Sequence, residues 1–120
     1  MANAKLLDIP GSMYVPYVML ADPTGAALVV PSSGALTGVL SSATDVVVLV
    51  ANTSRKGVII YNDSTAVLYL MLATGTSSAT SYSIQVPAGG NFTLNPGEYT
   101  GIIKGTWASV NGSARVTEFS

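Results

Sequence analysis

Two side chains that carry much of protein chemistry, histidine and cysteine, are missing from this 120-residue sequence. Without histidine the chain lacks the commonest general base and a common metal ligand. Without cysteine it has no thiol nucleophile, thiolate metal site or disulfide. Ser-His and Cys-His nucleophile arrangements are therefore excluded. The fold must depend on packing, backbone pairing and, we expect, association between subunits.

Charge is also scarce. Asp, Glu, Lys and Arg make up 9% of the residues, where roughly a quarter is usual. Ser, Thr, Asn and Gln supply the missing polarity, and a surface of this kind repels copies of itself only weakly. We therefore expect another subunit or partner to cover part of the surface. The alternative is a monomer with a hydroxyl-rich surface.

The net charge of −1 argues against nucleic-acid binding, which needs a cationic patch to neutralise phosphates. The pair Arg55-Lys56 is the only cationic cluster and is too small for that purpose. The longest apolar runs, 46–51 and 66–73, fall far short of the ~20 residues that cross a bilayer. Asp8 and Pro10 interrupt any signal-peptide core, so we expect no membrane contact and a protein made inside the cell.

Carboxylates remain as candidates for chemistry. They are Asp8, Asp22, Asp45, Asp63, Glu98 and Glu118. Two of them could in principle form a glycosidase-like pair, but each stands alone beside a turn or strand end, which favours solvated or turn-capping roles. The oxygens of Asn62-Asp63-Ser64 could hold calcium, although local turn hydrogen bonds explain them more simply. We predict no enzymatic activity, no cofactor and no metal site.

Strand patterns dominate from residue 45 onward. Residues 45–51 contain the continuous apolar run 46–51, which is typical of a strand covered on both faces. Residues 57–61 and 66–72 are rich in Val, Ile, Leu and Tyr. We predict that these two stretches fold back on each other through residues 62–65 as the central hairpin of the core.

The rest of the chain shows the same pattern of short strands separated by turns. Residues 81–86 and 91–95 alternate apolar with polar side chains, and turn residues follow at 87–90 and 96–97. Three further strands are predicted at 99–104, 106–110 and 114–119. Gly105 separates the first two, and Asn111-Gly112 is a strong hairpin signal before the third. No segment has a helical period.

These patterns predict an all-β fold, an antiparallel β-sandwich or jelly-roll-like body of about 7–9 short strands. Aromatic residues on the strands are expected to pack in the core or to anchor an interface. For Trp107 the alternative is stacking against a carbohydrate. We assign the body to residues 44–120.

Residues 1–43 differ from the body because four prolines interrupt them and no period persists. A short strand at 26–30 follows a turn at 22–25. The segment is too apolar for a disordered tail, so we assign it as an extended arm that packs on this domain or on a neighbour. Its candidate partner-contacting residues are Leu6, Leu7, Ile9, Tyr14, Tyr17 and Met19.

Three stretches of the body have a distinctive order of turns and aromatics. They are residues 52–57 with 61–70, residues 82–90, and residues 99–119. Over roughly residues 50–119 the chain resembles a family of small structural proteins of tailed-bacteriophage virions. The shared motifs are structural and not catalytic.

The resemblance implies a β-sandwich component of the virion without enzymatic activity. The most specific expectation is a head decoration, or cement, protein on the outer capsid surface. Such a protein would bind the major capsid protein and bridge capsomers, commonly as a homotrimer. The alternative is a tail, neck or fibre-associated virion protein that can contact the host surface. The resemblance leaves out residues 1–45, the part that varies with the attachment site in this family.

An extended arm fits this expectation because it can pair with an exposed sheet edge of another protein. Main-chain hydrogen bonds would then provide affinity, and pockets for alternate side chains would provide specificity. Attachment through an oligomer would convert a modest affinity per arm into stable binding.

Overall fold

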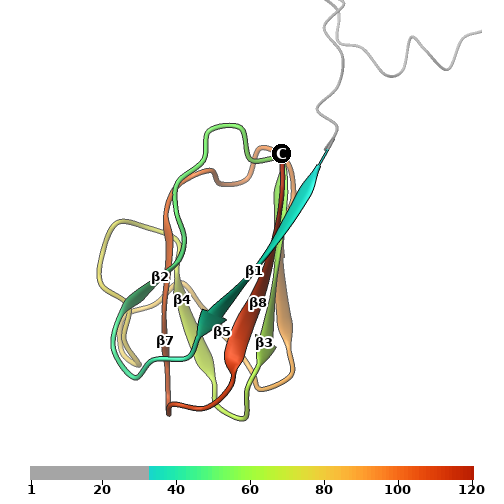
Figure 1. Cartoon of the computed structure of the whole chain (residues 1–120). Helices are drawn as coiled ribbons and strands as arrows, with labels where there is room; N and C mark the ends of the chain where they lie inside the picture. The colour runs from blue at the N-terminus through green and yellow to red at the C-terminus, as the bar shows by residue number, and fades with distance from the viewer. Residues whose placement is uncertain (1–32) are drawn as a thin grey trace, which may run out of the picture. The chain divides into compact units, whose positions relative to one another are not determined.

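The computed structural model describes residues 33–120, and this part of the chain consists of strands and the loops between them (Figure 1). All strand pairs are antiparallel. The strands are β1 (Gly34–Leu40), β2 (Val46–Leu49), β3 (Gly57–Asp63), β4 (Leu68–Met71), β5 (Ile84–Val86), β6 (Asn91–Leu94), β7 (Ile103–Trp107) and β8 (Ser113–Phe119). The all-β prediction is confirmed.

The strands form two sheets, which we name by their order. The first sheet runs β1-β8-β3-β6 and the second runs β2-β7-β4-β5. The pairs β1–β8, β2–β7, β3–β6 and β4–β5 are those of one long hairpin, and the contacts β3–β8 and β4–β7 roll that hairpin into two layers. Eight strands wound in this way make a jelly roll, as the sequence led us to expect.

The predicted central hairpin is wrong. Strands β3 and β4 lie in different sheets, so the chain crosses from one layer to the other between residues 63 and 68. Both strands direct buried side chains into the same core, among them Ile60 and Leu70. The apolar side chains of the two strands are therefore buried because the strands lie in facing sheets, about 10 Å apart, and not because the strands pair with each other.

Two glycines near the C-terminus, Gly105 and Gly112, have roles that differ from the predicted strand break and hairpin turn. Gly105 lies inside β7, so the strands predicted at 99–104 and 106–110 are replaced by one. A Cβ there would lie 2.8 Å from Val48 Cγ2 and 3.0 Å from Leu68 Cδ1, which leaves no room for a side chain. Gly112, with φ of 69°, does turn the chain, but between β7 and β8 in opposite sheets and not within a hairpin.

Two further predictions, on the burial of residues 45–51 and on the extent of the arm, differ from the structure at the edge strands β2 and β1. Strand β2 is an edge strand of the second sheet with Val48 buried and Val47 exposed, so it is not covered on both faces. Strand β1 lies in the range 1–43 assigned to the arm, yet it pairs with β8 over its whole length. The boundary between 43 and 44 is therefore wrong for residues 34–40, because β8 supplies the pairing that their weak pattern does not indicate.

Candidate interaction surface

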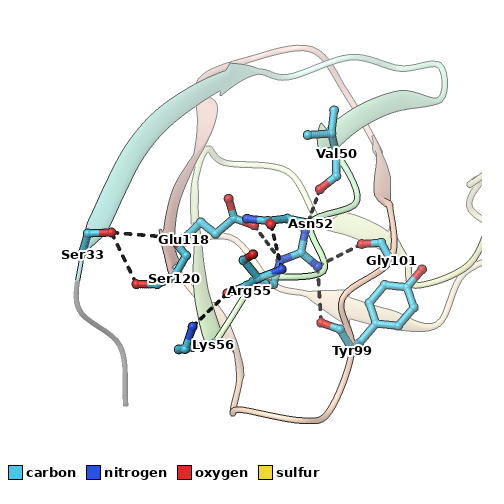
Figure 2. A network of polar contacts seen from close by, with 10 residues as sticks. Ser33, Val50, Asn52, Arg55, Lys56, Tyr99, Gly101, Glu118 and Ser120 are labelled. Carbon is cyan, nitrogen blue, oxygen red and sulfur yellow. Dashed lines mark hydrogen bonds and ion pairs between the residues drawn. The ribbon is translucent and has the colours of Figure 1, made fainter. Parts of the chain in front are cut away.

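A buried arginine joins the loops at one end of the sandwich (Figure 2). The side chain of Arg55 is 1% exposed, and its Nε donates to Glu118 Oε2 at 2.7 Å. Its two Nη atoms donate to the carbonyl oxygens of Gly101 at 2.9 Å and Val50 at 2.6 Å. These contacts tie strand β8 to the connections β2–β3 and β6–β7. The guanidinium is therefore committed to the fold and does not face a ligand.

A buried amide has a comparable place in the core. Asn62 Nδ2 donates to the carbonyl oxygens of Ala66 at 2.8 Å and Val86 at 3.0 Å. Its Oδ1 accepts bonds from Ser64 Oγ at 2.7 Å and Trp107 Nε1 at 3.2 Å. Trp107 is a core residue, 1% exposed, so the carbohydrate-stacking alternative is wrong.

The side-chain oxygens of residues 62–64, weighed as calcium ligands in the sequence, take part in hydrogen bonds within the protein. Asn62 Oδ1 already accepts two hydrogen bonds, and Asp63 Oδ2 accepts Arg115 Nε at 2.8 Å. Residues 33–120 contain no group of three or more acidic side chains that could hold a metal ion, and no pocket. In the same range no helix has the length and apolarity to span a membrane.

The outer face of the second sheet is covered around β7 by the chain's own polar contacts, while Val47 at its edge is exposed. Asp45 Oδ1 accepts Ser77 N at 2.7 Å and Ser77 Oγ at 2.6 Å, and Asp45 Oδ2 lies 2.7 Å from Lys104 Nζ. The hydroxyl of Thr106 donates to the Ser77 carbonyl at 3.0 Å. Ser77 is buried, so part of the loop between β4 and β5 is fastened onto β7.

Asp45 is held in its charged form by this arrangement. Burial on its own raises the pKa of Asp45. The hydrogen bonds from Lys104 and Ser77, together with the positive charge of Lys104, outweigh that effect and bring the pKa below its ordinary value of 3.8. A carboxylate with these partners is a structural anchor and not a general acid.

The other acidic residues predicted from the sequence are also in local contacts. Glu118 pairs with Arg55, Asp63 with Arg115, and Glu98 Oε1 accepts the Asn95 N–H at 2.8 Å across a turn. None of these contacts brings two carboxylates together as a glycosidase would need. Asp8 and Asp22 lie outside the described residues.

The first sheet differs because its outer face is open. We call "outer face" the side chains of β1, β8, β3 and β6 that point away from the core. The strand register places Leu36, Thr117, Ile59 and Thr93 in one row across this face. Leu36 is 67% exposed, and Ile59 is exposed too. Tyr61 lies in the next row, beside Arg115.

An aromatic ring covers two bare positions at one end of the outer face. Phe119 stands opposite Gly34 on one side and Gly57 on the other. A Cβ at Gly34 would lie 3.3 Å from Phe119 Cε1, and one at Gly57 would lie 3.6 Å from Phe119 Cδ2. The ring is therefore tight against the Cβ position of Gly34 and in ordinary contact distance of that of Gly57, and it adds another apolar group to the outer face.

Strand β1 gives this sheet a long open edge. It is seven residues long, and no strand within 33–120 pairs with its outer side. Sheet edges in soluble proteins are usually blunted by lysine, proline, a bulge or short length. Strand β1 has none of these, whereas the other three edge strands have three or four residues. This open edge and the outer face together are the candidate interaction surface.

This surface was not predicted from the sequence. The six candidate contact residues were placed in the arm and lie outside the described residues, as does the short strand expected at 26–30. The one available signal was the absence of charge between Asp22 and Asp45, which left β1 without the residues that protect an edge. A scan of protein-family models, a search of curated proteins and a search of solved structures found no match.

Proposed function

We propose that this chain is a structural protein of a tailed-phage virion, and specifically a decoration protein that binds the outer surface of the head. In this role it would bind the major capsid protein and stabilise the shell by bridging capsomers. The proposal rests on the resemblance of residues 50–119, and jelly rolls occur in viral capsid proteins as well as in lectins and cupins. Because fold alone does not determine function, the surface has to carry the argument.

The observation that favours binding to another protein is the exposed apolar outer face. Leu36, Ile59 and Tyr61 lie on it in a chain with little charge. Apolar side chains gathered on one face are typical of contact sites, with rings such as that of Tyr61 among the side chains enriched there. The polar side chains of the second sheet are, in contrast, engaged with each other.

The segment before residue 33 supplies the second part of the proposal. Its apolar residues Leu6, Leu7, Ile9, Tyr14, Tyr17 and Met19 would anchor the chain to the capsid. Attachment through both an arm and a face makes the second contact intramolecular, so that the two modest affinities combine. An oligomer would strengthen the attachment further.

Capsid binding can be measured with heads that lack the protein. Deletion of residues 1–20 should abolish co-sedimentation with these heads while circular dichroism shows an intact β body. Ile59→Lys should weaken binding about tenfold or more, because it puts a charge into an apolar contact. Gln85→Lys adds the same charge to an exposed position of the second sheet and should bind like the wild type.

The location of the protein separates this proposal from its alternative. Gold-labelled antibody should coat the head shell of intact virions. Labelling confined to the tail vertex would replace the decoration role by the tail, neck or fibre-associated role. Full binding by both the deletion and Ile59→Lys would overturn the assignment of the contact sites. Virions that lack the protein entirely would overturn the proposed function.

A further inference from the structure

We propose that the open edge of β1 pairs with β1 of a second copy, antiparallel and with Gly38 on the two-fold axis. The first sheets of the two copies would join into one continuous sheet. This inference concerns the isolated protein and does not depend on the capsid role. It predicts a two-fold pair, in contrast to the trimer that the phage resemblance implies.

The backbone of β1 is suitable for such pairing. Ser33 and Ser120 exchange hydrogen bonds of 3.1 and 3.0 Å, and the Ser41 N–H donates to the Gly112 carbonyl. Hydrogen-bonded and non-bonded pairs alternate along an antiparallel ladder. The odd-numbered residues of β1 therefore direct their N–H and C=O groups toward β8. The even-numbered residues, from Gly34 to Leu40, direct theirs toward the open edge.

The side chains of β1 are complementary to themselves. Leu36 is 67% exposed and Leu40 is 81% exposed, and both lie on the outer face two positions from Gly38. A two-fold axis at Gly38 places Leu36 opposite Leu40 of the partner subunit, and Leu40 opposite Leu36 of the partner subunit. Opposite side chains of paired strands lie about 5 Å apart at Cβ, so each leucine would gain an apolar neighbour.

The surroundings of β1 favour a second copy over another occupant. No charged residue occurs between Asp22 and Asp45, so two β1 strands would meet without like charges. A Cβ built on Gly38 has no atom within 4 Å, so the outer face is open at the proposed two-fold axis and can admit the leucines of both copies. A partner of different sequence would not need leucines placed symmetrically about a glycine, whereas a copy related by a two-fold axis does.

A single cysteine tests the register directly because the chain has none of its own. Hydrogen-bonded partners in an antiparallel pair have Cα atoms about 5.5 Å apart, within the range of about 4.4–6.8 Å that a disulfide spans. Oxidation or a short bismaleimide should therefore convert the Gly38→Cys protein to a covalent dimer. Thr93→Cys, on the opposite edge of the same sheet, is the control and should stay monomeric on a denaturing gel.

Variants with opposite charges at positions 36 and 40 test whether the partner of β1 is a second copy of the chain. The Leu36→Glu/Leu40→Glu protein and the Leu36→Lys/Leu40→Lys protein should each be monomeric at micromolar concentration in native mass spectrometry. Like charges across the pair should raise the dissociation constant about a hundredfold or more. An equimolar mixture should form the heterodimer, because each glutamate then faces a lysine. Thr93→Lys should dimerise like the wild type.

Three results would overturn the proposal. The first is a wild-type monomer at micromolar concentration together with a Gly38→Cys protein that does not cross-link. The second is a trimer whose formation the leucine variants leave unchanged. The third is cross-linking of Gly38→Cys to the major capsid protein in place of a second copy, which would assign the edge to a capsid segment.

Discussion

The outer faces of the two sheets differ in what covers them, although the strands of both sheets are short and antiparallel. On the second sheet the loop from 72 to 83 is held to β7 through Ser77 and Asp45, and Tyr82 lies against Tyr69 with ring centroids 5.0 Å apart. On the first sheet Leu36, Leu40 and Ile59 face outward. Hydrogen bonds and an ion pair thus cover the outer face of the second sheet around β7, although Val47 stays exposed at its edge, whereas the first sheet exposes apolar side chains on both β1 and β3.

The comparison of the two faces shows that an ion pair or a glycine can contribute differently to stability depending on how deeply it is buried. The protein contains ion pairs of nearly equal length on the two sheets and at their junction. Their surroundings range from buried to solvent-exposed. Substitutions matched for type should therefore separate the closed parts of the molecule from the open face.

The largest effect is expected from Arg55→Ala. It removes a buried guanidinium and leaves Glu118, 17% exposed, without its partner. Loss of one member of a buried pair costs about 3–5 kcal/mol of the free energy of unfolding. Arg115→Ala is the matched control on the outer face, where Arg115 and Asp63 are 58% and 43% exposed and such a pair is worth about 0–1 kcal/mol. Urea unfolding of both proteins measures the contrast, and equal losses would contradict it.

The next effect concerns two glycines. Gly105→Ala places a methyl group against Val48 and Leu68 in the core, and overpacking of this kind costs about 1–3 kcal/mol. Gly38→Ala meets no atom and removes backbone freedom from the unfolded chain, so it should be neutral or should stabilise by about 0.4–1 kcal/mol. The shift in thermal midpoint distinguishes the two. A Gly105→Ala protein as stable as the wild type would show that Val48 and Leu68, on the two strands beside β7, can shift to admit the methyl group.

A third comparison uses two aspartates. Asp45→Ala removes the acceptor of the buried Ser77 and the partner of Lys104, and we expect a loss of about 1.5 kcal/mol. Asp63→Ala removes the exposed partner of Arg115 and should cost about 0.5 kcal/mol or less. Amide hydrogen exchange should also rise in residues 72–83 of the Asp45 variant alone. Unchanged exchange there would mean that the loop is held by other contacts.

The smallest effect is the pH dependence due to Asp45. Because the pKa of Asp45 in the folded protein lies below 3.8, its contribution to stability is fully present above that value. The contribution is lost as the pH falls through the folded pKa. The stability difference between the wild type and Asp45→Asn should therefore shrink on acidification below pH 3.8. A difference that stays constant to pH 2 would contradict a lowered pKa.

The sequence predicted the fold class and the location of most turns, because alternation and turn residues are local signals. The turns at 87–90 and 96–97 are present, with positive φ at Gly89 and Gly97. Pairing was predicted less well, since a turn signal shows where the chain reverses but not whether it stays in one sheet. Both the 57–72 hairpin and the Asn111-Gly112 hairpin failed for this reason.

The residues that hold the fold together could not be identified from local patterns. Arg55 was interpreted only as half of a small cationic cluster with Lys56, whereas its partner Glu118 is 63 positions away in the sequence. Asn62 was interpreted as a turn residue, yet it bonds Trp107 across the core. The outer face was missed as well, because Leu36 and Ile59 become neighbours only after β8 has been inserted between their strands.

The central position of β8 has a consequence for the order of folding during synthesis. Strands β1 and β3 are separated in the first sheet by β8, the last of the eight strands to leave the ribosome. Until then neither strand has its shared neighbour, and only β4–β5 pairs strands adjacent in sequence. Long-range pairing of this kind is slow and leaves strand edges exposed in the nascent chain. The first sheet is therefore completed only after β8 has left the ribosome, and chaperones that shield unpaired strand edges have their greatest effect before that point.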